Sequence, residues 1–147
     1  MKLIFKNLIP IIILLLVISC GSTFSENRLI GTWKMVSAKT DGVSSPQELS
    51  DRRQVFSKDK TFASQLNTPN GLVQINGGIY VRPNDTTLIT YHRDLKGKLS
   101  TIANTYFFRI KSDTLHLYGN YLSPIKENPA LLMKVFIDER WVRIKSK

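Results

Sequence analysis

The chain has 147 residues, 42% of them hydrophobic, with a formal net charge of +10 and a single cysteine. This length supports one domain with an apolar core and leaves no room for two. A lone cysteine cannot form an intramolecular disulfide or a multi-cysteine metal site, so apolar burial must stabilise the fold.

The first twenty residues have the layout of an export signal. Lys2 and Lys6 precede an almost unbroken aliphatic run over residues 8–18, and Cys20 follows it. The run, about 11 residues, is shorter than the roughly 20 that a membrane-spanning helix needs, so residues 1–19 are interpreted as a signal peptide. Val17-Ile18-Ser19-Cys20 resembles the lipobox of bacterial lipoproteins, which implies lipidation of Cys20 and a membrane partner through its acyl chains. An ordinary signal with a chance cysteine is the alternative.

The basic charge bears on partners and location. An exported cationic domain meets anionic lipid headgroups or glycans rather than nucleic acid, although a cationic surface without any partner is an equal alternative. Gly21 follows Cys20 where many inner-membrane lipoproteins have Asp. The resemblance therefore implies a bacterial cell envelope location, anchored at the outer membrane. The sequence gives no indication of oligomeric state.

Beyond the signal, residues 20–27 are small and polar and are interpreted as a flexible tether, and residues 28–147 as one domain. A Gly pair at 77–78 predicts a bulge or bend, and the last strand is expected to bend at Asp138-Glu139. No helix of ten residues is predicted. The fold class is therefore all-β, an antiparallel sandwich or barrel, and about eight antiparallel strands can close into an up-and-down β-barrel. Alternation predicts strands at 29–39, 52–57, 61–66, 72–82, 86–93, 99–110, 114–122 and 131–144.

Short motifs carry a family resemblance. Gly31-Thr32-Trp33 in the first strand resembles the Gly-x-Trp motif of lipocalins, and Arg140 and Arg143 flank Trp141 in the last strand. With Gly78-Ile79-Tyr80, residues 28 to 145 resemble the small lipocalin-like domains of unknown function in bacterial lipoproteins. This resemblance implies a lipocalin-like barrel in which Trp33 plugs the closed end and an arginine packs across it. Arg140 and Arg143 lie on opposite faces of a regular strand, and the sequence does not decide which one reaches Trp33.

Aromatic residues at strand positions are the candidate ligand-binding residues. Tyrosines that line a barrel offer an apolar wall with a polar tip, although packing in a solid core would use the same residues. The candidates are Tyr80, Tyr91, Tyr106, Phe108 and Tyr118. Basic residues near strand ends could ring one mouth of the barrel and attract an anionic ligand, or be scattered and solvated: Arg52, Arg53, Arg82, Arg93, Lys96 and Lys98.

The sequence shows no catalytic or metal-binding constellation. His92 and His116 have no second ligand at a metal-binding spacing, no Gly-x-Ser-x-Gly elbow occurs, and Asp138-Glu139 is interpreted as solvated. We expect a non-enzymatic protein without a metal or cofactor; an enzyme would need either histidine in a pocket beside a carboxylate. Two functions stay open. The barrel binds a small apolar or amphipathic ligand, or it is filled and serves as an interaction module in an envelope assembly.

Overall fold

The computed structural model describes residues 26–44, 51–125, 127–128 and 131–145. The expected signal peptide, the lipidation site at Cys20 and the tether up to residue 25 lie outside the described residues. A short helix, α2 (Glu26–Leu29), precedes the first strand and begins two residues before the expected start of the domain. Within the described ranges, no helix is both long enough and apolar enough to span a bilayer.

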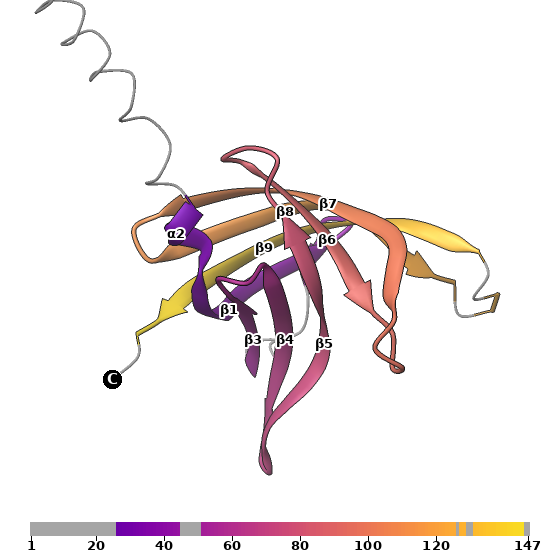
Figure 1. Cartoon of the computed structure of the whole chain (residues 1–147), viewed down its shortest axis with the longest axis horizontal. Coiled ribbons are helices and arrows are strands. Elements are labelled where there is room, and N and C mark those ends of the chain that lie inside the picture. The colour runs from indigo at the N-terminus through magenta and orange to yellow at the C-terminus, as the bar shows by residue number, and fades with distance from the viewer. Residues whose placement is uncertain (1–25, 45–50, 126, 129–130, 146–147) are drawn as a thin grey trace, which may run out of the picture.

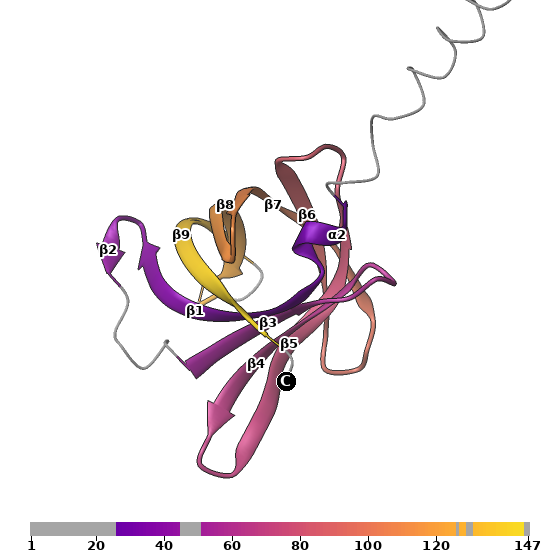
Figure 2. The ribbon, with the colours of Figure 1, turned by 90° about the vertical axis from the view of Figure 1, so that its left-hand side faces the viewer.

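The described residues form nine antiparallel strands in one sheet. Its order is β2-β1-β3-β4-β5-β6-β7-β8-β9, and pairing of β1 with β9 closes it (Figures 1 and 2). Two-residue β2 pairs only with the end of β1, so β1 and β3 to β9 make the eight-stranded wall. The predicted fold class, an up-and-down lipocalin-like barrel, is confirmed. The strands are β1 (Gly31–Thr40), β2 (Val43–Ser44), β3 (Arg52–Phe56), β4 (Thr61–Thr68), β5 (Gly71–Val81), β6 (Thr87–Arg93), β7 (Leu99–Lys111), β8 (Thr114–Pro124) and β9 (Leu132–Ile144).

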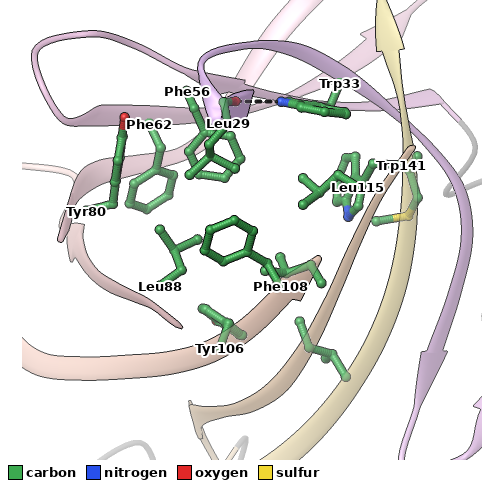
Figure 3. Close-up of a cluster of buried hydrophobic side chains, with 13 residues drawn as sticks. Leu29, Trp33, Phe56, Phe62, Tyr80, Leu88, Tyr106, Phe108, Leu115 and Trp141 are labelled. Atoms are coloured by element: carbon green, nitrogen blue, oxygen red, sulfur yellow. Dashed lines mark hydrogen bonds between the residues drawn. The ribbon is translucent and has the colours of Figure 1, made fainter. Parts of the chain in front are cut away.

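Strand alternation places the core inside the barrel. In β7, Tyr106 and Phe108 are buried, whereas Thr105, Phe107 and Arg109 are exposed. The same period of two runs through the other long strands, because successive side chains point to opposite faces of a sheet. Figure 3 shows the resulting cluster, which is rich in aromatic rings. Its members are Leu29, Trp33, Met35, Phe56, Phe62, Tyr80, Leu88, Tyr106, Phe108, Leu115, Leu117, Ile137 and Trp141.

The two ends of the barrel differ. At the end where β1 begins, Leu29 and Trp33 are fully buried, and Trp33 Nε1 donates a hydrogen bond to the Leu29 carbonyl at 2.9 Å (Figure 3). Helix α2 lies at this closed end. At the opposite end, where β1 finishes and β3 starts, the hairpin of β4 and β5 extends past β6, since β5 pairs with β6 only through residues 78–81. We call this the open end.

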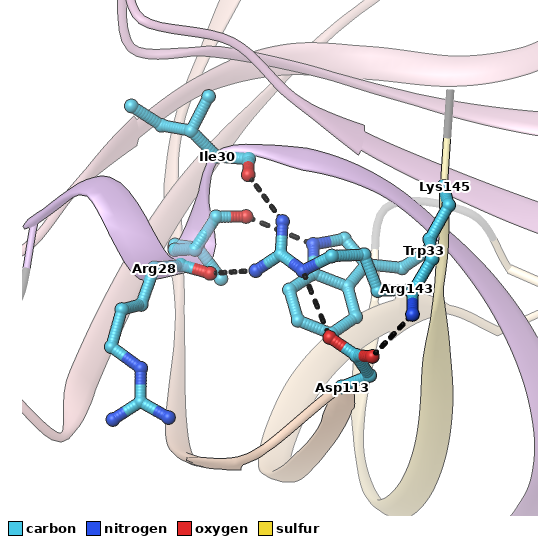
Figure 4. A network of polar contacts seen from close by, with 7 residues as sticks. Arg28, Ile30, Trp33, Asp113, Arg143 and Lys145 are labelled. Carbon is cyan, nitrogen blue, oxygen red and sulfur yellow. Dashed lines mark hydrogen bonds and ion pairs between the residues drawn. The ribbon is translucent and has the colours of Figure 1, made fainter. Parts of the chain in front are cut away.

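Arg143, not Arg140, packs on Trp33. Its guanidinium carbon lies 4.2 Å from the centre of the Trp33 ring, and the guanidinium donates hydrogen bonds to the carbonyls of Arg28 and Ile30 (Figure 4). A Cβ added at Gly31, where φ is +136°, would lie 2.6 Å from Arg143 Nη1. Glycine at this position therefore makes room for the arginine. The Gly-x-Trp motif has a physical reason in this chain.

The register shifts of the sheet do not coincide with the residues that were expected to bulge or bend. The register of β4 against β5 shifts opposite Ile75, before the Gly77-Gly78 pair. Gly78 instead permits close packing, because an added Cβ would lie 2.0 Å from the Tyr91 carbonyl oxygen of β6. β9 pairs with β8 without a shift through Asp138 and Glu139, and the bulge near the closing seam is in β1, between Met35 and Ser37.

Candidate ligand-binding cavity

The barrel encloses a cavity of about 270 Å³ that opens at the open end. Its deep wall is apolar and includes Met35, Phe56, Leu88 and Trp141. The remaining wall is contributed by every strand of the barrel and carries many polar groups. These other lining residues are Ala38, Thr40, Arg52, Arg53, Gln54, Phe62, Ser64, Asn76, Thr90, His92, Tyr106, Leu117, Tyr121, Ile137 and Glu139.

Of the five candidate aromatic residues, Tyr106 alone lines the cavity. Tyr80 and Phe108 are buried in the core below it, where the Tyr80 hydroxyl donates to the Ser57 carbonyl at 2.8 Å. Tyr91 and Tyr118 alternate with the inward-facing residues of β6 and β8 and therefore lie on the outer face of the barrel. The sequence did not separate these groups, because aromatic residues at strand positions serve a core, a cavity and an outer face alike.

Glu139 faces the cavity from β9, between the inward-facing Ile137 and Trp141. Trp141 Nε1 donates a hydrogen bond to Glu139 Oε2 at 3.2 Å. Burial raises the pKa of Glu139 to about 7, while the Trp141 hydrogen bond and the charge of Arg52 act in the opposite direction. The interpretation of Asp138-Glu139 as a solvated pair is therefore corrected for Glu139. The alternation Val135, Ile137, Glu139, Trp141 contained the signal for its inward position.

Arg52 enters the cavity from the start of β3 and contributes to the field at Glu139. Its Nε atom is buried and, among the described residues, has no hydrogen-bond partner. A buried guanidinium N–H without a partner costs free energy, roughly 1 to 3 kcal/mol or more for a charged group. The charge of Arg52 nevertheless lies at the cavity wall, beside any molecule bound there.

A second polar group lies across the cavity on β5 and β6. His92 Nδ1 is 2.9 Å from Asn76 Oδ1, which also accepts the Gly77 amide hydrogen. The imidazole therefore carries its proton on Nδ1, and Nε2 is left to accept from the Thr90 hydroxyl at 3.4 Å. Burial lowers the pKa of His92, which favours a neutral ring. Burial also raises the pKa of Tyr106, and the Glu139 charge adds to this, so its phenol remains a donor.

The basic residues are divided between the two ends. Arg52 and Arg53 line the cavity, and Arg93, Lys96 and Lys98 lie in or beside the turn after β6, at the open end. Arg82, by contrast, follows β5 at the closed end, and its guanidinium carbon lies 5.1 Å from the Phe108 ring centre. Five of the six basic residues therefore lie toward the open end, and Arg82 does not.

The second histidine lies outside the barrel. His116 Nε2 and Asp138 Oδ1 are 2.7 Å apart on the outer face, beside the Tyr118 ring. Within the described ranges, no three His, Cys, Asp or Glu side chains gather closely enough to hold a metal ion. No protein-family model and no curated protein matches the chain.

Proposed function

We propose that this protein is a lipid-anchored lipoprotein of the bacterial envelope whose barrel binds a small amphipathic molecule. The cavity of about 270 Å³, apolar at depth and polar toward its mouth, is the observation that carries the proposal. A cavity of about 150 Å³ holds benzene, so this volume suits a ligand of about ten non-hydrogen atoms. Pockets for drug-sized ligands start near 300 Å³, which places the ligand at the small end of that range.

The distribution of polar groups supports an amphipathic rather than a purely apolar ligand. Phe56, Leu88 and Trp141 offer a chain or ring an apolar surface. Nearer the mouth, Arg52 and Glu139 offer a donor and a carboxyl group. A polar head at this level can form hydrogen bonds that a hydrocarbon cannot.

The anchor rests on the sequence. The motif that ends at Cys20 supports lipidation there, and Gly21 in place of Asp supports delivery to the outer membrane. Helix α2 joins the barrel at the closed end, so an anchor at Cys20 would be connected to the end opposite the cavity mouth. A Cys20→Ser variant expressed in a bacterial host should lose incorporation of a labelled fatty acid and leave the membrane fraction. Unchanged labelling in that variant would contradict the proposed anchor.

Calorimetric titration with octan-1-ol tests the binding function. The chain from residue 21 onward retains every described strand and removes competing acyl chains. We expect one site per molecule and a negative heat-capacity change, since binding removes apolar surface from water. Ala38→Phe should abolish binding, because Ala38 lines the cavity and the added ring occupies it. Ala103→Phe is the matched control, because Ala103 is exposed on the outer face of β7.

A filled interaction module is the second candidate function. The observation that favours it is a group of exposed apolar side chains around the open end: Val43, Leu72, Val73, Ile75, Leu122, Leu132 and Met133. This candidate predicts that octan-1-ol does not enter the barrel, so the same titration discriminates. That the protein is not an enzyme remains a prediction under both candidates.

A further inference from the structure

We infer that the cavity selects an amphiphile with a single anionic head, which pairs with Arg52 while Glu139 carries a proton, and this inference rests on the proposed ligand-binding function. The head group is therefore the determinant of specificity. Binding takes up one proton from solvent onto Glu139, which then donates a hydrogen bond to the head. The chemistry of the head group decides which class of amphiphile binds, whereas the cavity volume limits the length of its alkyl chain.

The first support is the unsatisfied donor. Arg52 Nε is buried and lacks a hydrogen-bond partner among the described residues, and no ion pair within 4 Å joins Arg52 to Glu139. The guanidinium presents a planar fork of N–H donors that matches a carboxylate, sulfonate or phosphate oxygen pair. Arg52 lines the cavity, so an anion bound there would neutralise its charge, which a neutral hydroxyl cannot do.

The second support is the state of Glu139. Its carboxyl receives one hydrogen bond from Trp141 and is partly buried, so the neutral and ionised forms are close in free energy near neutral pH. An anion beside Glu139 disfavours a second negative charge. The carboxyl therefore holds its proton when an anion binds, and a protonated carboxyl is a hydrogen-bond donor.

Among the described residues, the other groups around Glu139 in the cavity are cations, phenols, uncharged side chains and one histidine, and none is a second carboxyl group. From β3, Arg52 and Arg53 line the cavity as cations. Tyr106 from β7 and Tyr121 from β8 contribute phenols, and β1 contributes the uncharged Ala38 and Thr40. Burial lowers the pKa of His92 from β6, which favours the neutral ring. Asp138, the chain neighbour of Glu139, points outward to His116 and raises the pKa of Glu139 slightly through its charge.

Titration calorimetry with four eight-carbon compounds separates the contribution of the head group to affinity from that of the alkyl chain. Octane-1-sulfonate stays ionised at all working pH values, so any pH dependence of its binding comes from the protein. Octanoate, octan-1-ol and octylammonium complete the series. At pH 6 we expect the sulfonate to bind about tenfold to hundredfold more tightly than the alcohol, the range of a charged hydrogen bond. Above pH 7.5 we expect the sulfonate affinity to fall about tenfold per pH unit, because one proton must be taken up.

Variants assign these effects to residues. Glu139→Gln should remove the pH slope while it keeps a donor of the same shape. Arg52→Met should reduce the ratio of sulfonate to alcohol affinity to about one. Arg52→Lys, which keeps the charge but lacks the Nε–H fork, provides a second test if the methionine variant is poorly folded. Arg140→Met is the matched control, because Arg140 is on the exposed face of β9.

The possible results have distinct meanings. Equal affinity for the sulfonate and the alcohol, or tightest binding of octylammonium, would overturn the anionic-head inference and leave the proposed function standing. A pH slope that persists in Glu139→Gln would overturn the role of that residue. Failure of all four compounds to bind would contradict the proposed function itself.

Discussion

The guanidinium of Arg143 lies over the indole of Trp33, its central carbon 4.2 Å from the ring centre (Figure 4). The same guanidinium donates to two carbonyls of the segment that precedes β1, while the main chain of Arg143 lies in β9. One side chain therefore connects the first strand, the last strand and the N-terminal segment at the seam that closes the barrel.

Removal of this side chain should destabilise the barrel. Arg143→Ala loses the cation–π contact and the charged hydrogen bonds to the carbonyls of Arg28 and Ile30. We expect a decrease of about 2 to 4 kcal/mol in the free energy of unfolding, measured by urea denaturation. Arg140→Ala, on the exposed face of the same strand, should change it by less than about 0.5 kcal/mol. Similar effects of the two variants would contradict the assigned role.

Gly78 should tolerate no side chain. An added Cβ would lie 2.0 Å from a backbone oxygen of Tyr91, so Gly78→Ala must separate β5 from β6 where they share only a short pairing. We expect a loss of more than about 2 kcal/mol in unfolding free energy. Gly97→Ala, in open space at φ +80°, should cost only about 1 kcal/mol. An equal cost at the two positions would contradict the packing role of Gly78.

Stability should decrease as pH rises through the window set by Glu139. The unfolded carboxyl ionises near 4.5 and the folded carboxyl near pKa 7. Between these values the folded state binds more protons than the unfolded state, so the unfolding free energy falls with increasing pH, by up to about 3 kcal/mol at 1.36 kcal/mol per pKa unit. Below 4.5 and above 7 this contribution is constant.

Glu139→Gln isolates that effect. The difference in urea-unfolding free energy between this variant and the unchanged protein should grow from pH 5 to pH 8, in favour of the variant. The lowered pKa of His92 destabilises the fold toward acidic pH in both proteins and so cancels in the difference. A difference that does not depend on pH would mean that Glu139 titrates normally.

Tyr106 should limit the length of the bound chain. Tyr106→Leu extends the cavity, so the affinity for decan-1-ol relative to octan-1-ol should rise. At about 0.8 kcal/mol per buried CH₂, two additional methylenes correspond to a rise of about tenfold. Tyr118→Leu alters an outer-face side chain and should leave the ratio unchanged. Competition between the two alcohols, followed by calorimetry, measures the ratio.

The fold could be predicted from the sequence because its information is local. Period-two alternation and turn residues located the long strands and indicated an antiparallel sandwich or barrel, and the resemblance to lipocalins favoured the barrel. The sequence alone could not decide between Arg140 and Arg143, since the choice depends on the register of β9 against β1. The bulge at Ile75 was also hidden, because one extra residue in a strand leaves no compositional mark.

The candidate site was harder to predict for a physical reason. Residues that line a cavity and residues that fill a core point to the same face of a strand, so Tyr106 and Phe108 look alike in sequence. The polar lining was underestimated because a charged residue in a strand is usually solvated. Glu139 and Arg52 depart from that rule, although the alternation of Glu139 with Ile137 and Trp141 indicates its inward position.

Intermolecular nuclear Overhauser effects between unlabelled octan-1-ol and the isotope-labelled protein test ligand binding inside the barrel most directly. We predict contacts from the alkyl chain to the methyl groups of Leu88, Leu117 and Ile137, which line the cavity. Contacts confined to exposed residues of the open end, such as Leu72 and Leu122, would contradict binding inside the barrel and favour the interaction module.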